Sequence, residues 1–257
     1  MLRGDALLTD EIKNFFSNDP GFTTAGTRQY QQGCTHMFDG GKLGGIQSCG
    51  SGMHGRYLTG IRTSAIDLSD GYNIAMKVDH DSGLLQGAVY HPSPNCDDRP
   101  DPEDLSLIVI HNISLPPGEF GGGYIDALFT NSLQPDAHPY FREIHQLQVS
   151  AHLLIRRDGG LIQYVPFHKR AWHAGESCYE GRVCCNDYSI GIELEGTDEL
   201  PYTDEQYTVL QQAVSSLLNA YPRLEQSRIA GHCDIAPERK TDPGPAFDWN
   251  RFASALV

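Results

Sequence analysis

The stretch LSLIVIHN (Leu105–Asn112) predicts a buried strand of the core. Its run Leu107–Ile110 is short, apolar and rich in β-branched residues, as buried strands are. His111 ends this run, and Asn112 opens a polar loop rich in Pro and Gly. Because a polar residue at the end of a buried strand often faces a cleft, His111 is a candidate functional residue. The alternative is a histidine at the edge of the core that bonds a backbone carbonyl, and one histidine alone favours that alternative.

A second strand is predicted in YSIGIELEGTD (Tyr188–Asp198), where apolar and polar residues alternate. Period two places the aliphatic side chains on one face and Glu193 and Glu195 on the other. Gly191 lies on the face of the two glutamates and has no side chain, which leaves room for a ligand beside Glu193. The alternative is a pair of carboxylates that face solvent, and the strand alone favours that alternative.

Local signals elsewhere complete the fold prediction. Asp158-Gly159-Gly160 lies between two apolar segments and predicts a hairpin. Thr203–Gln206 is a capping box that opens an amphipathic helix, and Pro222 stops it. Short helices are expected over residues 138–148 and from Ile125–Phe129. Strands mixed with helices of this size predict an α/β fold with a central mixed β-sheet flanked by helices.

The segment GHCDIAPERKTDPG (Gly231–Gly244) carries the densest chemistry of the chain. His232 and Asp242 are possible metal ligands, and Lys240 adds a cation two residues before the carboxylate. Prolines fix φ along the segment, so it can hold ligands in place without a long helix. A catalytic zinc site normally takes three protein ligands and keeps one open position, so a third ligand must come from upstream. His111 is the best candidate.

Five motifs in order give a specific resemblance: IVIHN, SAHLLIRRDG, RAWHAG, CNDYSIGIELEGTD and GHCDIAPERKTDPG. Together they resemble the AmpD family of 1,6-anhydro-N-acetylmuramoyl-L-alanine amidases, over roughly residues 84 to 253. This family belongs to a wider group of zinc amidases that includes the peptidoglycan-recognition proteins, so the resemblance implies their amidase-like fold. A cysteine often serves as third ligand in the wider group, and Asp242 at that position favours the AmpD branch.

The resemblance implies a site and a reaction. Zinc would be bound by His111, His232 and Asp242, and would activate a water whose pKa falls toward about 7. Glu193 would be the general base and Lys240 would stabilise the oxyanion. The bond cleaved would join anhydro-N-acetylmuramic acid to L-alanine of a muropeptide, a step of peptidoglycan recycling.

Other polar residues near the motifs have more than one interpretation. Trp172, His173 and Asn186 are candidate substrate-binding residues, with His173 expected to line the cleft, and Trp172 is as readily a core residue. His152 and His173 could both be ligands on spacing alone, but the family pattern uses neither as a ligand, and His152 is expected to be structural. Cys233 follows His232 in a segment expected to be extended, where neighbouring side chains point apart, so a buried thiol is expected.

The amino-acid composition limits the kinds of binding partner and the cellular compartment that we expect. The net charge is −14, which argues against nucleic acid, and no apolar run of 18 residues suggests a membrane span. The first residues carry acids and lack the apolar core of a secretory signal. Seven cysteines without framework spacing suggest free thiols in a reducing compartment. We therefore expect a cytoplasmic monomer whose partner is a small muropeptide.

Residues 1–75 fall outside the resemblance, and we expect residues 76–257 to form the amidase domain. The first segment is Gly-rich and poor in hydrophobic periodicity, so a loosely ordered extension or a misplaced start at a true Met76 is expected. Cys34, His36, Cys49 and His54 lie there, but their spacing is not a usual zinc pattern.

Two other functions remain open from sequence. One is a module that binds cell-wall fragments without cleaving them, which usually lacks a ligand or catalytic group. All five expected positions are filled here, which favours the enzyme. The other is an amidase that acts on intact wall outside the cell, which would require a signal peptide.

Overall fold

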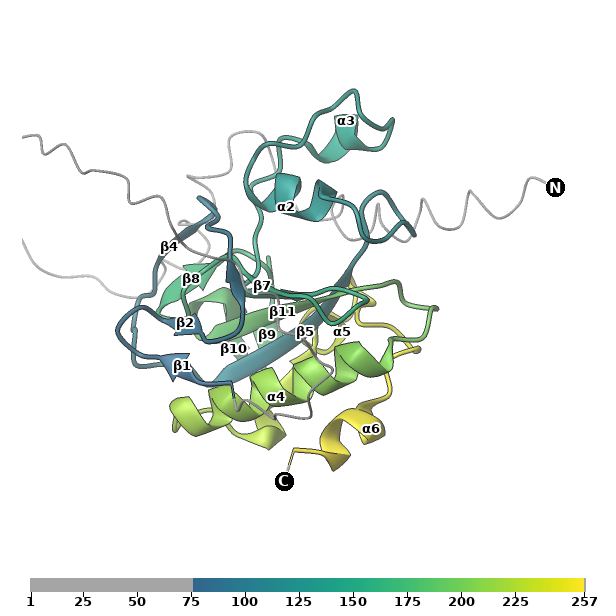
Figure 1. Ribbon diagram of the computed structural model, residues 1–257. Helices are drawn as coiled ribbons and strands as arrows, with labels where there is room; N and C mark the ends of the chain where they lie inside the picture. Colours follow the sequence, from purple (N-terminus) through teal and green to yellow (C-terminus); the bar gives the residue numbers. More distant parts are fainter. Residues whose placement is uncertain (1–75, 257) are drawn as a thin grey trace, which may run out of the picture.

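Two parallel buried strands form the centre of the sheet in the computed structural model, which describes residues 76–256 (Figure 1). They are β5 (Leu107–Ile113) and β11 (Ser189–Glu195), and every residue of both is buried. Their register pairs Glu193 with His111. The prediction that His111 ends its strand was wrong, because pairing with β11 carries β5 on to Ile113.

Within residues 76–256, the sheet has six strands in the order β12-β5-β11-β6-β7-β3. The outer strands are β12 (Ile229–Gly231), β6 (Leu153–Ile155), β7 (Leu161–Gln163) and β3 (Val89–Tyr90). Strands β6 and β7 are antiparallel and form the predicted hairpin, whereas the other neighbours run parallel. The predicted mixed sheet is therefore confirmed.

The long helix α4 (Asp204–Ala220) covers one face of this sheet (Figure 1). The capping box is present, since Gln206 N donates to Thr203 Oγ1 and the Gln206 side chain accepts from Thr203 N. The helix packs through its apolar stripe onto the alternate aliphatic residues of β5 and β11, and α6 (Trp249–Ser254) extends the same core. His111, Glu193 and Glu195 lie on the other face of the central strands, where Leu107 and Val109 form part of a separate apolar cluster.

Short helices cover the opposite face: α2 (Tyr124–Phe129), α3 (Phe141–Ile144) and α5 (His232–Ile235). The helix predicted from Ile125 is present as α2. The helix predicted over residues 138–148 is a single turn, in which Phe141 and Ile144 are buried, and Tyr140 and Leu147 contact the same core from outside the turn. Two 3-10 turns, η1 (Cys185–Asp187) and η2 (Gln226–Arg228), precede β11 and β12.

Three two-stranded ribbons lie outside the main sheet. They are β1 (Val78–Asp79) with β2 (Leu84–Leu85), β4 (Cys96–Asp98) with β8 (Lys169–Ala171), and β9 (Cys178–Tyr179) with β10 (Arg182–Val183). The β9–β10 ribbon leads directly into η1 and so into the central strand β11.

The cysteines depart in one respect from the expectation of free thiols. Cys96, Cys178, Cys185 and Cys233 are free, but Cys184 is disulfide-bonded, so the expectation was wrong for this residue. None of the other described cysteines is its partner, since all four are free.

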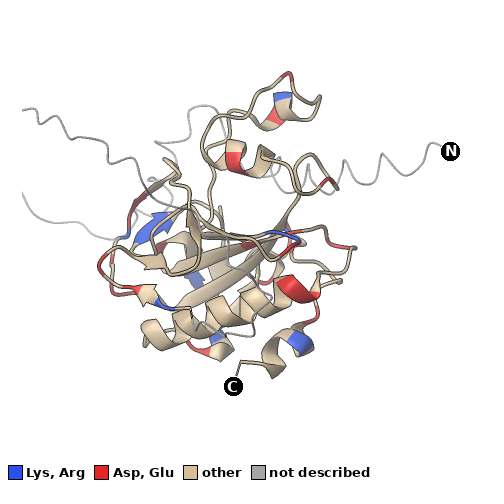
Figure 2. Ribbon diagram, in the orientation of Figure 1, with Lys and Arg blue, Asp and Glu red and all other residues tan. Residues whose placement is uncertain are grey.

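Charge is distributed over the surface rather than gathered on one element. Acidic residues occur in α2, in α3 and in the first turn of α4 (Figure 2). None of the helices between residues 76 and 256 combines the length and the hydropathy that a bilayer-spanning helix requires.

The described fold begins at Met76, and the N-terminal 75 residues, with Cys34, His36, Cys49 and His54, lie outside the described residues. Ser216 Oγ of α4 donates to the Met76 carbonyl over 2.8 Å, and the Met76 side chain packs against the core. The first described residue is thus hydrogen-bonded to α4, the helix that packs on the sheet.

We expect a chain that starts at Met76 to fold and to turn over at the full-length rate, because the core and all candidate site residues follow it. Steady-state kinetics and thermal melts of the two proteins, run side by side, measure this. Both proteins should be assayed under the same reducing conditions. A shortened protein that is insoluble, or many-fold slower, would show that residues 1–75 belong to the working domain.

Candidate metal and catalytic site

The parallel pairing of β5 with β11 brings His111 and Glu193 together. Both side chains point to the face opposite α4, and both are buried. Strand β12 pairs with the other edge of β5, with Gly231 opposite Ile110, and α5 begins at the next residue. His232 therefore lies beside His111 although 121 residues separate them in sequence.

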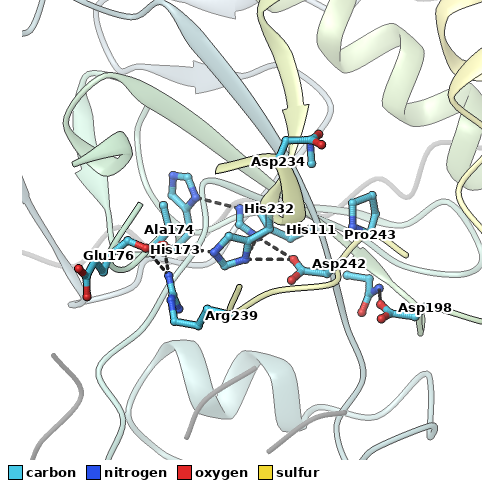
Figure 3. Close-up of polar contacts among 12 residues, drawn as sticks. His111, His173, Ala174, Glu176, Asp198, His232, Asp234, Arg239, Asp242 and Pro243 are labelled. Atoms are coloured by element: carbon cyan, nitrogen blue, oxygen red, sulfur yellow. Dashed lines mark hydrogen bonds and ion pairs between the residues drawn. The ribbon is translucent and has the colours of Figure 1, made fainter. Parts of the chain in front are cut away.

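Asp242 completes a compact group with the two histidines (Figure 3). Nδ1 of His111 lies 3.0 Å from Nδ1 of His232, and Asp242 Oδ2 lies 3.1 Å from each of these nitrogens. The backbone holds Asp242 there, because Cys233 N donates to the Asp242 carbonyl over 2.9 Å. The chain then turns at Gly244, whose φ is +77°, and a side chain at this position would collide with the backbone of Asp198.

The three donors fit a divalent metal ion. Their ligand atoms all lie within 4.8 Å of one another, and all three residues are buried. Asp242 Oδ1 is buried without a hydrogen-bond partner, which is costly for a carboxylate unless a cation satisfies it. Burial lowers the pKa of His232 to about 4, so its ring is neutral, as a metal ligand must be. Two imidazole nitrogens and one carboxylate oxygen form a donor set that zinc accepts.

Glu193 and Lys240 lie next to this group. Burial, and then the negative charge of Asp242, raise the pKa of Glu193 well above its ordinary value, while Lys240 opposes the shift. Glu193 Oε2 is buried without a hydrogen-bond partner. A buried carboxylate with a raised proton affinity is suited to accept a proton at neutral pH.

A pocket opens onto Glu193, His232 and Lys240. Its other lining residues are Phe129, Val149, Ser150, Trp172, His173, Gly175 and Arg239. Trp172 is half-buried, and its Nε1 donates to Asp97 Oδ1 over 3.2 Å, so one edge of the indole is held while another part borders the pocket. The pocket therefore has an apolar, aromatic wall next to charged and polar side chains. Such a pocket can bind a ligand that has both apolar and polar groups.

The space beside Gly191 is filled. A Cβ at Gly191 would collide with the ring of His173, whose Nδ1 lies 2.9 Å from His111 Nε2. The expectation that this glycine leaves room for a ligand was therefore wrong, because a neighbouring loop supplies the occupant. Asn186 is buried behind the same loop, and its Oδ1 accepts hydrogen bonds from His173 N and Ala174 N.

His152, His173 and Cys233, the alternative ligands that the sequence offered, all lie outside the group of three donors. His152 is fully buried and accepts a hydrogen bond from Gly191 N at Nδ1, and its Nε2 lies 3.1 Å from the Lys169 carbonyl. Cys233 belongs to the helical turn α5, so the expectation of an extended segment was wrong, and its thiol is half-buried rather than buried. Burial raises the pKa of its thiol to about 11.

Sequence reasoning missed Arg239. It lines the pocket and donates from Nη2 to the carbonyls of Ala174 (3.0 Å) and Glu176 (2.6 Å) (Figure 3). Its only signal in the sequence was its position beside Lys240, because its partners lie more than 60 residues away.

Known proteins resemble this chain over the region that carries the site. The family model for N-acetylmuramoyl-L-alanine amidases matches residues 101–245. The 1,6-anhydro-N-acetylmuramyl-L-alanine amidase AmpD of Escherichia coli (strain K12) is 63% identical over 172 residues, which cover 67% of this chain and 93% of that protein. The Haemophilus influenzae protein of the same name is 54% identical over 178 residues, covering 69% and 97%. A crystal structure of a selenomethionine AmpD derivative has a TM-score of 0.67 at 62% identity, covering 69% of this chain and 98% of that one.

Proposed function

Since the chain belongs to the N-acetylmuramoyl-L-alanine amidase family, we propose that it is a zinc-dependent amidase acting on anhydro-muropeptides. It is an amide hydrolase. The bond proposed to be cleaved joins 1,6-anhydro-N-acetylmuramic acid to L-alanine. The observation that carries the proposal is the buried group of His111, His232 and Asp242 beside a buried carboxylate in one pocket.

His111, His232 and Asp242 would hold the zinc ion. Bound there, zinc would act as a Lewis acid toward the amide carbonyl and lower the pKa of a water. Glu193 takes a proton from the attacking water, and its raised pKa equips it to do so near neutral pH. The same carboxyl group then gives the proton to the leaving amine of L-alanine.

Lys240 supplies positive charge on the wall of the pocket that Glu193 also lines. A cation fixed in a buried site stabilises the oxyanion that forms when water adds to the carbonyl, which is often worth about 3 kcal/mol. Trp172 offers the pocket an aromatic surface, and we assign it to packing against the substrate.

The anhydro sugar is assigned by similarity. The E. coli relative named for this substrate is matched over 93% of its length at 63% identity. We propose that residues 76–257 are the amidase domain and that it serves peptidoglycan recycling in the cytoplasm, as a monomer.

Mass spectrometry of purified protein incubated with matched muropeptides tests the substrate. We expect release of the stem peptide from the 1,6-anhydro form, and much slower release from the same muropeptide with a reducing-end sugar. A chelator-treated sample should be inactive and regain turnover with added zinc. Equal cleavage of both sugars would contradict the anhydro assignment, and no cleavage of either would contradict the proposed substrate class.

A further inference from the structure

The two ligand histidines are held from behind by adjacent residues of one loop. Both present Nδ1 to the group with Asp242. On the far side, His111 Nε2 lies 2.9 Å from His173 Nδ1, and His232 Nε2 lies 3.1 Å from the Ala174 carbonyl (Figure 3). A single dipeptide therefore faces both rings.

The chemistry of imidazole gives these contacts a direction. A neutral ring carries one proton, so a lone pair at Nδ1 for a metal places the proton on Nε2. His111 then donates to His173 Nδ1, and His232 donates to the Ala174 carbonyl. His173 in turn carries its own proton on Nε2, which lies 3.1 Å from Ser189 Oγ. With these proton positions, each contact from His111 through His173 to Ser189 pairs one donor with one acceptor, and Nδ1 of His111 keeps its lone pair for a metal.

The dipeptide is itself fixed. Asn186 Oδ1 accepts from His173 N over 3.1 Å and from Ala174 N over 2.8 Å. Arg239 Nη2 donates to the Ala174 carbonyl over 3.0 Å. Asn186 lies in η1, immediately before β11, so the central strand and the dipeptide share one support.

The His173 ring is also fixed by shape. The three atoms nearest to a hypothetical Cβ on Gly191 all belong to this ring, and all would overlap it. Gly191 lies in β11 and has no positive φ, so alanine suits its backbone, and the nearest atoms that its Cβ would meet are those of the His173 ring. The absence of a side chain at Gly191 is therefore what lets His173 reach His111.

We propose that the His173–Ala174 dipeptide, fixed by Asn186 and seated against Gly191, is a positioning element for both metal-ligand histidines. This inference rests on the proposed zinc site. His173 and Asn186 then act through the ligands and not through substrate. Outer hydrogen bonds of this kind orient ligand rings and raise their basicity, and their loss commonly weakens metal binding by about 10- to 100-fold.

Zinc affinity, measured by competition with a chromogenic chelator, tests the proposal without an activity assay. His173→Leu, Asn186→Leu and Gly191→Ala are each expected to weaken zinc binding by about 10- to 100-fold. His173→Asn is the matched control, because its amide oxygen can stand near the place of Nδ1 and accept from His111. We expect it to bind zinc within a few-fold of the unmodified protein. The absorption bands of the cobalt(II)-loaded proteins should change in the leucine and alanine variants and be kept in His173→Asn.

Gly191→Ala placed in a His173→Ala background gives a further check on the shape argument. Truncation of residue 173 at Cβ removes Cγ, Nδ1 and Cδ2, the ring atoms that the added methyl group would overlap, so Gly191→Ala should weaken zinc binding far less in this background than in the unmodified protein. Melts of the metal-free proteins identify any variant that fails to fold, and the remaining pairs still decide the outcome.

These measurements distinguish a failure of the positioning role from a failure of the metal site. If the unmodified protein binds zinc and His232→Ala does not, but His173→Leu and Gly191→Ala bind as tightly as the unmodified protein, only the positioning role is refuted. If the unmodified protein binds no zinc, the metal site is refuted and the positioning role with it.

Discussion

Glu193→Gln is expected to lower kcat by about 10²- to 10⁴-fold, the usual contribution of a general base, while zinc binding is kept. The carboxamide has almost the same shape but cannot take a proton from water. Glu193 is outside the three-donor group and lines the pocket beside it, so its loss should spare the metal. Steady-state kinetics together with metal analysis of the same sample measure both quantities. A near-normal kcat would overturn the proposed role.

The same substitution should leave the stability unchanged or raise it. Burial raises the pKa of Glu193, which means that the ionised form is less stable in the folded chain than in water. Above that raised pKa the charged carboxylate opposes folding, and a neutral amide removes this effect. We expect the melting temperature of Glu193→Gln to equal or exceed that of the unmodified protein, most clearly in the metal-free state.

Glu195→Gln is the matched control on the same strand and the same face. Its two carboxylate oxygens accept from Gly121 N over 2.7 Å and from Arg157 N over 3.1 Å. In Glu195→Gln, the side-chain NH₂ group would face one of these backbone N–H groups, which then has no acceptor. The free energy of unfolding should fall by about 1 to 3 kcal/mol as a result. This variant should melt earlier while kcat per folded molecule changes far less. The opposite pattern, stability kept and turnover lost, would contradict the separate roles of the two glutamates.

Local periodicity was sufficient to predict the central strands and the long helix. The run Leu107–Ile110 and the alternation in Ser189–Glu195 are consequences of burial, so they appear in the sequence itself. The capping box at Thr203 is likewise a local hydrogen-bond pattern. The end of β5 was misplaced because it depends on pairing with β11, which lies some 80 residues later.

The chemistry of the candidate site could be predicted in part for a different reason. His232, Lys240 and Asp242 are close in sequence, and the motifs gave His111 and Glu193 by resemblance. The side chains that surround these residues depend on how distant strands and loops are arranged in the fold. His173 meets His111 across 62 residues and fills the space beside Gly191, so a glycine that suggested a cavity instead marks a close contact. No spacing rule reports which side chain will occupy such a position.

His232→Ala and Asp242→Asn are expected to abolish stoichiometric zinc binding. The unmodified protein should hold about one zinc per chain, because three buried donors leave one position open. Removing either donor leaves two, and the loss should exceed the roughly 100-fold of an outer hydrogen bond. Asp242→Asn keeps the shape of the side chain, so its effect reports the carboxylate charge that both histidine Nδ1 atoms face at 3.1 Å.

Asp234→Asn is the control in the same segment. Asp234 is exposed and two residues from His232, and its Oδ2 accepts from Gly231 N at the start of α5. Asparagine can still accept that bond, so zinc content should stay near one per chain. Mass spectrometric metal analysis after dialysis against buffered zinc gives the stoichiometry. Thermal melts add a second measurement, since zinc at 100 times its Kd should stabilise the unmodified protein by about 2.7 kcal/mol and the ligand variants hardly at all. Full zinc occupancy in His232→Ala would mean that the metal is held elsewhere, and the assignment of all three ligands would then fail together.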